Sequence, residues 1–182
     1  MSVVSTSVSP SIAGGRAQRS PQPGWPARGI HVPFGKDRHN ENELMIWGII
    51  PLSIKVSTAD TGGALFLFQH KDMGKGGPPR HVHHEQEEWF YAIEGEYRIE
   101  VGDERFLLRP GDSVLAPRKV PHVWAHISNH PGTLLTALTP AGTFETFIRD
   151  AARLATLPPP EEVARAFAAH GMTVVGPPLP IE

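Results

Sequence analysis

Two histidines spaced like metal ligands stand near the middle of the chain, in the stretch GGPPRHVHHEQEEWFYAIEG at residues 76–95. If residues 80–83 form a strand, His81 and His83 point to the same face, because alternate side chains share a face. Two imidazoles on one face can bind one metal ion at about 2.1 Å from each nitrogen. Glu88 opens the next expected strand, where its carboxylate can lie beside them as an anionic third ligand.

A fourth candidate ligand lies in the stretch PGDSVLAPRKVPHVWAH at residues 110–126. Pro121 fixes the backbone before His122, which suits a histidine presented to the interior. His122 would complete a site of three histidines and one glutamate. An isolated HxH pair on a surface strand is solvated more often than it binds metal, so the interpretation depends on the whole set. By strand parity, Trp124 and His126 share the interior face of His122.

Short strands must position these residues. Turn-forming sequences such as TGG at 61–63 and PGD at 110–112 separate apolar runs, which predicts an all-β sandwich or barrel without βαβ units. We expect strands at Leu44–Ile50, Leu52–Ser57, Ala64–His70, Arg80–His83, Glu88–Ile93, Glu96–Val101, Arg105–Leu108, Ser113–Ala116, His122–Ile127 and Leu134–Leu138.

The flanks of this region differ from it in pattern. Residues 1–29 are rich in Ser, Pro, Gly, Ala and Arg, and we expect a flexible or loosely docked arm with Trp25 as an anchor. Residues 30–140 are expected to form the barrel and residues 141–182 a C-terminal helical extension. The first helix of this extension is expected to have Thr143 as its cap and to run to Leu154, and the second helix to cover residues 158–171. Their apolar stripes predict packing on the barrel or at a dimer seam, without a ligand role.

Composition excludes several function classes. The 182 residues include no cysteine, so disulfides, thiolate catalysis and zinc–sulfur sites are absent. The net charge of −2 gives no basic surface for nucleic acid, and no apolar run is long enough to cross a membrane. No signal-peptide pattern opens the chain, so we expect a cytoplasmic protein.

The two histidine-containing stretches resemble the two motifs of the cupin superfamily. The first motif, G-x5-HxH-x3–4-E-x6-G, matches His81, His83, Glu88 and Gly95, with the leading Gly76 one residue too close. In the second motif, G-x5-P-x-G-x2-H-x3-N, three positions match and two depart. Gly111, Pro117 and His122 are in register, whereas Lys119 replaces the second glycine and His126 replaces the asparagine.

The resemblance, over about residues 50–140, implies a single cupin β-barrel of the jelly-roll type, often dimeric, with metal held by His81, His83, Glu88 and His122. Nitrogen and carboxylate ligands accept Fe, Mn, Ni, Co, Cu or Zn as one divalent ion. Four protein ligands on a six-coordinate ion leave two positions for substrate and O2, or for water.

The chain also resembles small bacterial proteins described as quercetinase-like. This resemblance implies a metal-dependent dioxygenase acting on a phenolic or enolisable small molecule, with Glu88 as ligand or as catalytic base. Two alternatives stay open: a non-catalytic cupin that binds a small metabolite, and a redox-neutral metal-dependent isomerase or lyase. The residues expected to line the substrate pocket are Phe66, Phe68, Phe90, Trp124 and His126. For His126, a place in the core or a hydrogen bond to a metal ligand is equally consistent with the pattern.

Overall fold

The computed structural model describes residues 28–181. Trp25 and almost all of the predicted N-terminal arm lie outside the described residues. Within the described range the chain forms eleven β-strands, two α-helices and one short 3-10 helix, η1 (Thr58–Thr61).

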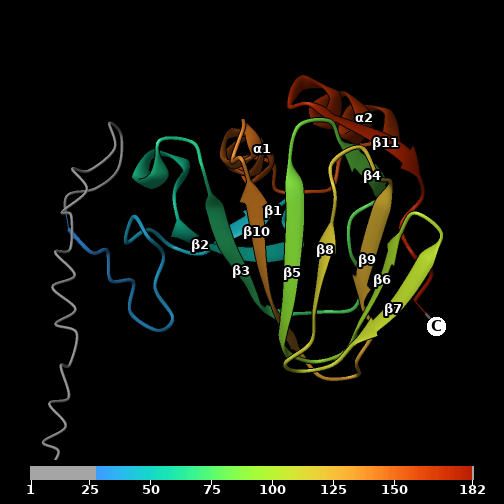
Figure 1. Cartoon of the computed structure of the whole chain (residues 1–182), viewed down its shortest axis with the longest axis horizontal. Coiled ribbons are helices and arrows are strands. Elements are labelled where there is room, and N and C mark those ends of the chain that lie inside the picture. Colours follow the sequence, from blue (N-terminus) through green and yellow to red (C-terminus); the bar gives the residue numbers. More distant parts are fainter. Residues whose placement is uncertain (1–27, 182) are drawn as a thin grey trace, which may run out of the picture.

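The strands form two antiparallel sheets (Figure 1). The six-stranded sheet contains, in spatial order, β1 (Leu44–Ile46), β2 (Ile50–Val56), β3 (Phe66–Met73), β10 (Gly132–Thr139), β5 (Glu87–Glu94) and β8 (Ser113–Ala116). The five-stranded sheet contains β11 (Met172–Gly176), β4 (Arg80–His83), β9 (His122–His126), β6 (Tyr97–Val101) and β7 (Glu104–Leu108). The predicted all-β, jelly-roll type of barrel is confirmed.

The core lies between the two sheets, and its residues alternate along the strands. In β5, Glu88, Phe90 and Ala92 are buried, whereas the residues between them are partly exposed. Phe90 and Ala92 belong to a hydrophobic core that also includes Ile99 of β6 and Trp124 of β9 in the facing sheet. Strand β9 is buried on both faces, because Val123 and Ala125 pack against Leu179 of the C-terminal segment.

Both helices lie at one end of the barrel, the upper end in Figure 1. They are α1 (Phe144–Ala151) and α2 (Pro160–Ala169). Phe144, Phe147 and Phe167 of these helices join a core cluster with Phe66 and Phe68 of β3. The helices therefore close the barrel with aromatic side chains, as their apolar spacing predicted for packing on its body.

The structure differs from the predicted elements in two places near the helices. Residues 44–50 do not form one strand, because a turn at 47–49 separates β1 from β2. Trp47 and Gly48 have φ angles of 51° and 72°, which a continuous strand does not permit. Strand β11, which follows α2 and pairs with β4, was not predicted. It is five residues long, and its flanking prolines and glycine resemble loop sequence.

The end of α1 also differs from its prediction. The helix stops at Ala151, and Leu154 beyond it is exposed. Thr143 occupies the N-cap position, but its side chain makes no capping hydrogen bond and instead lies 3.4 Å from the carbonyl oxygen of His170. Among the described residues, no helix is both long enough and apolar enough to span a lipid bilayer.

A close backbone contact beside the first motif gives a testable consequence. A Cβ atom at Gly77 would lie 1.9 Å from the backbone oxygen of Trp124, which is inside contact distance. We therefore expect Gly77→Ala to lower the free energy of unfolding by about 2 kcal/mol or more, because the strand β9 backbone cannot move away freely. The matched control is Gly74→Ala, whose added Cβ would meet nothing within 4 Å. Equal urea midpoints for the two variants would contradict this reading of the contact.

Candidate metal centre

Four candidate ligands converge on one point from two facing sheets. His81 and His83 come from β4, His122 comes from β9, and Glu88 comes from β5 of the other sheet. His81 and His122 are direct partners in the antiparallel pairing of β4 with β9. One ligand atom from each of the four side chains lies within 4.8 Å of all the others, and all four residues are buried.

The Glu88 carboxylate is the common neighbour of the three imidazoles. Its Oε2 lies 3.0 Å from Nε2 of His122, 3.2 Å from Nε2 of His83 and 3.8 Å from Nε2 of His81. The three rings also contact one another, with centroids 4.5 to 5.5 Å apart. Strand parity had predicted this common orientation, and the structure brings the four residues together.

The outer nitrogens of the three rings are all occupied by oxygen acceptors. Nδ1 of His81 is 2.8 Å from the carbonyl oxygen of Pro79, and Nδ1 of His122 is 3.1 Å from that of Val120. Nδ1 of His83 is 3.0 Å from the side-chain oxygen of Gln86. Because a carbonyl oxygen only accepts, each Nδ1 carries a proton, so each Nε2 is the atom that would present its lone pair to a bound metal ion.

Gln86 is a positioning residue that the sequence did not reveal. Its side chain is buried, its Oε1 accepts from His83, and its Nε2 donates to the carbonyl oxygen of Ala141 at 2.6 Å. It therefore fixes the ring of His83 and ties it to the segment that precedes α1. In sequence it lies within HEQE, where polar residues are typical of a solvent-exposed turn.

The turn before β9 explains the departure of Lys119 from the second motif. Lys119 has a φ of 66°, a conformation that favours glycine, and its N–H donates to the carbonyl oxygen of His83 at 2.7 Å. The turn keeps the left-handed backbone although its side chain is not glycine. It thereby links the loop before His122 to the strand that carries His83.

Burial and charge act in opposite directions on the ionisable groups of the cluster. Burial raises the pKa of Glu88, but the hydrogen bond with His122 and the close approach of His81 and His83 outweigh burial and hold its pKa well below the usual 4.5. Burial lowers the pKa of His81 to about 4. Burial also lowers the pKa of His83, but the adjacent Glu88 carboxylate outweighs it and leaves the pKa raised.

The cluster fits a divalent metal ion. Nε2 of His83 is buried and has no aligned hydrogen-bond partner, although a carboxylate oxygen lies 3.2 Å away. The three Nε2 atoms and the Glu88 carboxylate face one another in a buried site. A cation between them would compensate the carboxylate charge, whose burial is otherwise costly. The buried His/His/Glu/His set has the composition of a metal site of the Fe, Mn, Co, Ni, Cu or Zn type.

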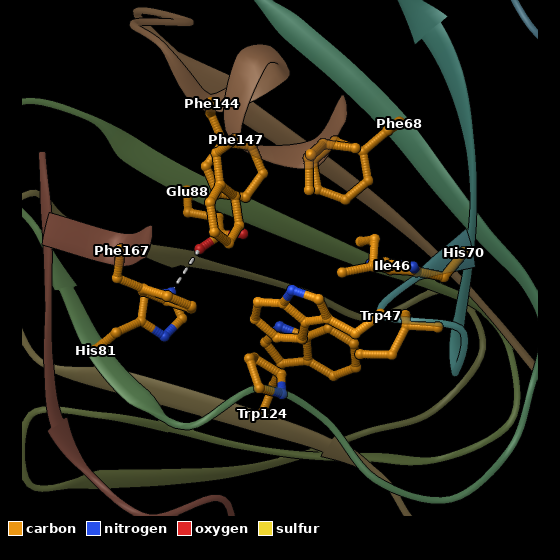
Figure 2. A pocket seen from close by; sticks show the side chains of 13 residues that line it. Ile46, Trp47, Phe68, His70, His81, Glu88, Trp124, Phe144, Phe147 and Phe167 are labelled. Atoms are coloured by element: carbon orange, nitrogen blue, oxygen red, sulfur yellow. Dashed lines mark ion pairs between the residues drawn. The ribbon is translucent and has the colours of Figure 1, made fainter. Parts of the chain in front are cut away.

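A small cavity of about 50 Å³ adjoins the cluster (Figure 2). His81 and Glu88 lie on one side of it, and Ile46 and His70 lie on the other. Among its described lining residues, His70 is the single ionisable side chain other than His81 and Glu88. The remaining lining residues are apolar or aromatic: Ile46, Trp47, Ile50, Phe68, Pro78, Trp124, Phe144, Phe147, Ile148 and Phe167.

The cavity lining contains only part of the predicted pocket. Phe68 and Trp124 line the cavity, whereas Phe66, Phe90 and His126 do not. Phe66 and Phe90 are fully buried in the two core clusters instead. Strand parity predicts that a side chain points into the barrel, but it does not predict how far along the barrel the side chain lies. That position decides whether the side chain is packed in the core or lines the cavity.

His126 lies far along β9 from the cluster, packed on Tyr97 with ring centroids 5.2 Å apart. Its Nδ1 is 3.1 Å from the carbonyl oxygen of Gly74, and its ring lies against Gly95 and Gly132. It makes no hydrogen bond to the candidate ligands, so of the two predicted places it occupies the one in the core.

The C-terminal helices pack against the site, although none of the four candidate metal ligands belongs to them. Phe144 of α1 packs on the ring of His83 with centroids 5.5 Å apart, and Phe167 of α2 packs on His81 at 5.2 Å. Spacing in the sequence indicated only that these residues are buried. Their contact with the histidines depends on the path of the chain between residues 139 and 144, which no local pattern specifies.

His70 is a further site residue that the sequence analysis missed. It lies on the inward face of β3, and its Nδ1 is 2.8 Å from the carbonyl oxygen of Pro51. Burial lowers the pKa of His70 to about 4, so the ring is neutral at pH 7. The single signal was its alternation with Phe66 and Phe68, which applies to any interior strand residue.

Comparison with known proteins agrees with the motifs. Residues 69–138 match the family described as Cupin domain, and this stretch contains all four candidate ligands. This stretch is a cupin domain. The cupin region therefore extends from the middle of β3 to the end of β10, and the helices and β11 lie outside the matched stretch.

Three relatives illustrate how far this cupin resembles other proteins. An uncharacterized protein, MJ1618, from Methanocaldococcus jannaschii is 32% identical over 65 residues, covering 36% of this chain and 52% of the relative, about half its length. KdgF from Halomonas sp. is 24% identical, with a TM-score of 0.47, covering 56% of this chain and 88% of that one. An RmlC-like cupin from Shewanella frigidimarina is 21% identical, with a TM-score of 0.46, covering 62% and 93%.

Removal of one ligand tests the cluster. We expect His122→Ala to reduce bound metal at least tenfold while the barrel stays folded, because Nε2 of His122 would supply one of four ligands. Elemental analysis after reconstitution measures the bound metal, and circular dichroism shows whether the barrel is folded. The control is His84→Ala. The ring of His84 is exposed and lies outside the cluster, with its Nε2 2.9 Å from the hydroxyl of Thr173. A variant that keeps full metal content would show that His122 is not a ligand.

Acid stability of the metal-free protein tests the buried state of His70. A folded pKa of about 4 against 6.5 means that the unfolded chain binds more protons between these values. Stability is therefore complete above pH 6.5 and falls with pH, by about 2.5 kcal/mol between pH 7 and 4.5 from this residue. His70→Asn keeps an N–H donor for the carbonyl oxygen of Pro51 but cannot be protonated. In urea titrations, its free energy of unfolding should therefore fall less between pH 7 and 4.5 than that of the wild type. Equal falls in both proteins would contradict a buried neutral ring.

Proposed function

We propose that this cupin is a metal-dependent oxygenase that acts on a phenolic or enolisable small molecule, as its resemblance to quercetinase-like cupins implies. His81, His83, Glu88 and His122 would hold one divalent transition-metal ion. One observation carries the proposal: this buried ligand set borders a small, largely aromatic cavity in which His70 is the single further ionisable group among the described lining residues.

The ligand set supports a reactive ion. Four protein donors on a six-coordinate ion leave two positions, and open positions distinguish catalytic from structural sites. When bound, the ion would supply Lewis acidity to a substrate hydroxyl and, if redox-active, bring the substrate and O2 together.

The side chains of the cavity would orient the substrate and exclude water. Phe68 and Phe144 stack on each other and Trp124 also lines the cavity, so its aromatic surface suits a planar organic group. Glu88 is ionised at neutral pH because its pKa lies well below the usual value, so it accepts and does not donate. His70 is neutral at pH 7 and would accept a hydrogen bond from a substrate hydroxyl at the far side of the cavity.

The size of the cavity restricts how a substrate binds. A volume of about 50 Å³ has room for about four water molecules, whereas sites for drug-sized ligands measure about 300–1,000 Å³. A flavonol therefore requires movement of the cavity wall, and small enols or catechols require less. This restriction favours a substrate whose reactive end alone enters the inner cavity.

Two further expectations from the sequence are part of this proposal. We propose that the protein acts in the cytoplasm and as a homodimer. The non-catalytic binder and the redox-neutral isomerase or lyase are the outcomes against which the oxygenase is tested.

Oxygen uptake distinguishes these functions. We expect protein reconstituted with Fe(II), Mn(II), Co(II), Ni(II) or Cu(II) to consume O2 with at least one of quercetin, catechol and acetylacetone. His70→Asn should keep the metal content but lower kcat about 100-fold, because a positioned proton acceptor contributes on this scale. Rates from an oxygen electrode and elemental analysis measure the two effects.

The controls separate chemistry from binding. Metal-free protein and His122→Ala should consume no O2, and Leu115→Ala, at an exposed position on β8, should match the wild type. Metal and substrate binding without O2 uptake over the whole panel would reject the oxygenase and favour a binding protein, or an isomerase if product forms anaerobically.

A further inference from the structure

A second, larger hollow lies directly outside the inner cavity. This apolar groove measures about 640 Å³, against about 50 Å³ inside. Three residues, Trp47, Ile50 and Pro78, line both spaces, so they form the partition between the groove and the metal-side cavity. The groove therefore lies next to the candidate metal centre, with one layer of side chains between them.

The chemistry of the groove is uniform. Each of its described lining residues is glycine, proline, valine, leucine, isoleucine or tryptophan, so no charged side chain faces a ligand there. Ile49, Leu157 and Val175 on its walls are about half exposed, at 56%, 54% and 49%. Exposed apolar side chains gathered in a concave site mark a binding surface more often than scattered ones do.

The walls of the groove are rigid. Pro78 and Pro79 form one side, and Pro177 and Pro178 belong to the segment after β11 that faces them. The N–H of Arg80 donates to the carbonyl oxygen of Pro177 at 3.2 Å, which ties the two sides together. Proline-fixed walls lose little conformational freedom when a ligand binds, which lowers the entropic cost of binding.

Trp47 is the largest part of the partition. Its backbone has a φ of 51°, and its N–H donates to the carbonyl oxygen of Ala151 at 3.1 Å. The indole packs on Phe147 and Phe167 with centroids 6.1 and 6.4 Å apart. A rotation of this one side chain, or its removal, would join the two spaces.

We propose that the apolar groove is the outer compartment of the substrate site and that Trp47 is the gate between the compartments. The groove binds the uncharged, apolar part of an organic molecule whose polar end passes Trp47 toward Glu88 and the histidines. This inference rests on the proposed function for the polar end, whereas binding in the groove needs neither metal nor O2. It also accounts for an inner cavity that is too small for a whole substrate.

Binding of an uncharged fluorescent probe tests the groove. N-phenyl-1-naphthylamine titrated into the metal-free and metal-loaded full chain should bind saturably. Leu157→Glu and Val175→Glu should each weaken binding at least tenfold, because they place a charge in an apolar wall. Both positions are half exposed, so the fold should tolerate the changes. The matched control is Leu115→Glu, equally exposed at 52% but on β8 and outside the groove, and it should change binding less than twofold.

Several results would overturn the groove as a small-molecule site. These are the absence of saturable binding, equal effects of Leu157→Glu and Leu115→Glu, or a fall in molar mass by light scattering with Leu157→Glu alone. The last would show that a second copy of the chain covers the groove. Probe binding without oxygen uptake would reject the oxygenase proposal and support the groove as a binding site. Oxygen uptake without probe binding would support the oxygenase and reject the groove as a binding site.

Metal exchange tests the gate separately. A chelator such as 4-(2-pyridylazo)resorcinol should withdraw Co(II) at least tenfold faster from Trp47→Ala than from Trp47→Phe, because alanine opens the partition and phenylalanine largely fills it. Circular dichroism verifies that both variants are folded. Equal withdrawal rates in two folded variants would overturn the role of Trp47.

Discussion

One buried carboxylate determines the requirements of the site. Glu88 is surrounded by three imidazole nitrogens within 3.8 Å and stays ionised because the hydrogen bond with His122 and the proximity of His81 and His83 outweigh the effect of burial on its pKa. The outer nitrogens are held by oxygen acceptors, so the inner nitrogens are the atoms that would bind a cation. The aromatic cavity and the two helices exclude water from the Glu88 carboxylate. Its attraction to a bound cation would therefore be stronger than in water.

The arrangement of the elements follows from this requirement. The carboxylate comes from one sheet and the imidazoles from the other, so the barrel must close with a fixed register. Gln86 joins His83 to the segment before α1, and the Lys119 turn joins the loop before His122 to β4. The ligands are therefore oriented by hydrogen bonds from three separate segments, which agrees with the importance of outer contacts at metal sites.

The sequence was most informative where chemistry depends on local spacing. Strand parity and the two motifs predicted that His81, His83, Glu88 and His122 meet. Turn spacing predicted an all-β sandwich or barrel, and the resemblance to cupins implied the jelly-roll type. The parts that were not predicted depend on long-range packing. Phe167 and His70 reach the cavity through chain paths without local signals, and Phe66 and Phe90 lie at core depths that parity does not resolve. The β11 strand was missed because its partner β4 is distant in sequence.

The origin of the four ligands in opposite sheets has a mechanical consequence. An ion held by Glu88 on β5 and by histidines on β4 and β9 would be a covalent-like crosslink between the two halves of the sandwich. In a chain without a single cysteine, such an ion would take the place that disulfide bonds occupy in other small β-proteins. Unlike a disulfide, this crosslink contains no S–S bond to be reduced, and it responds instead to the supply of metal.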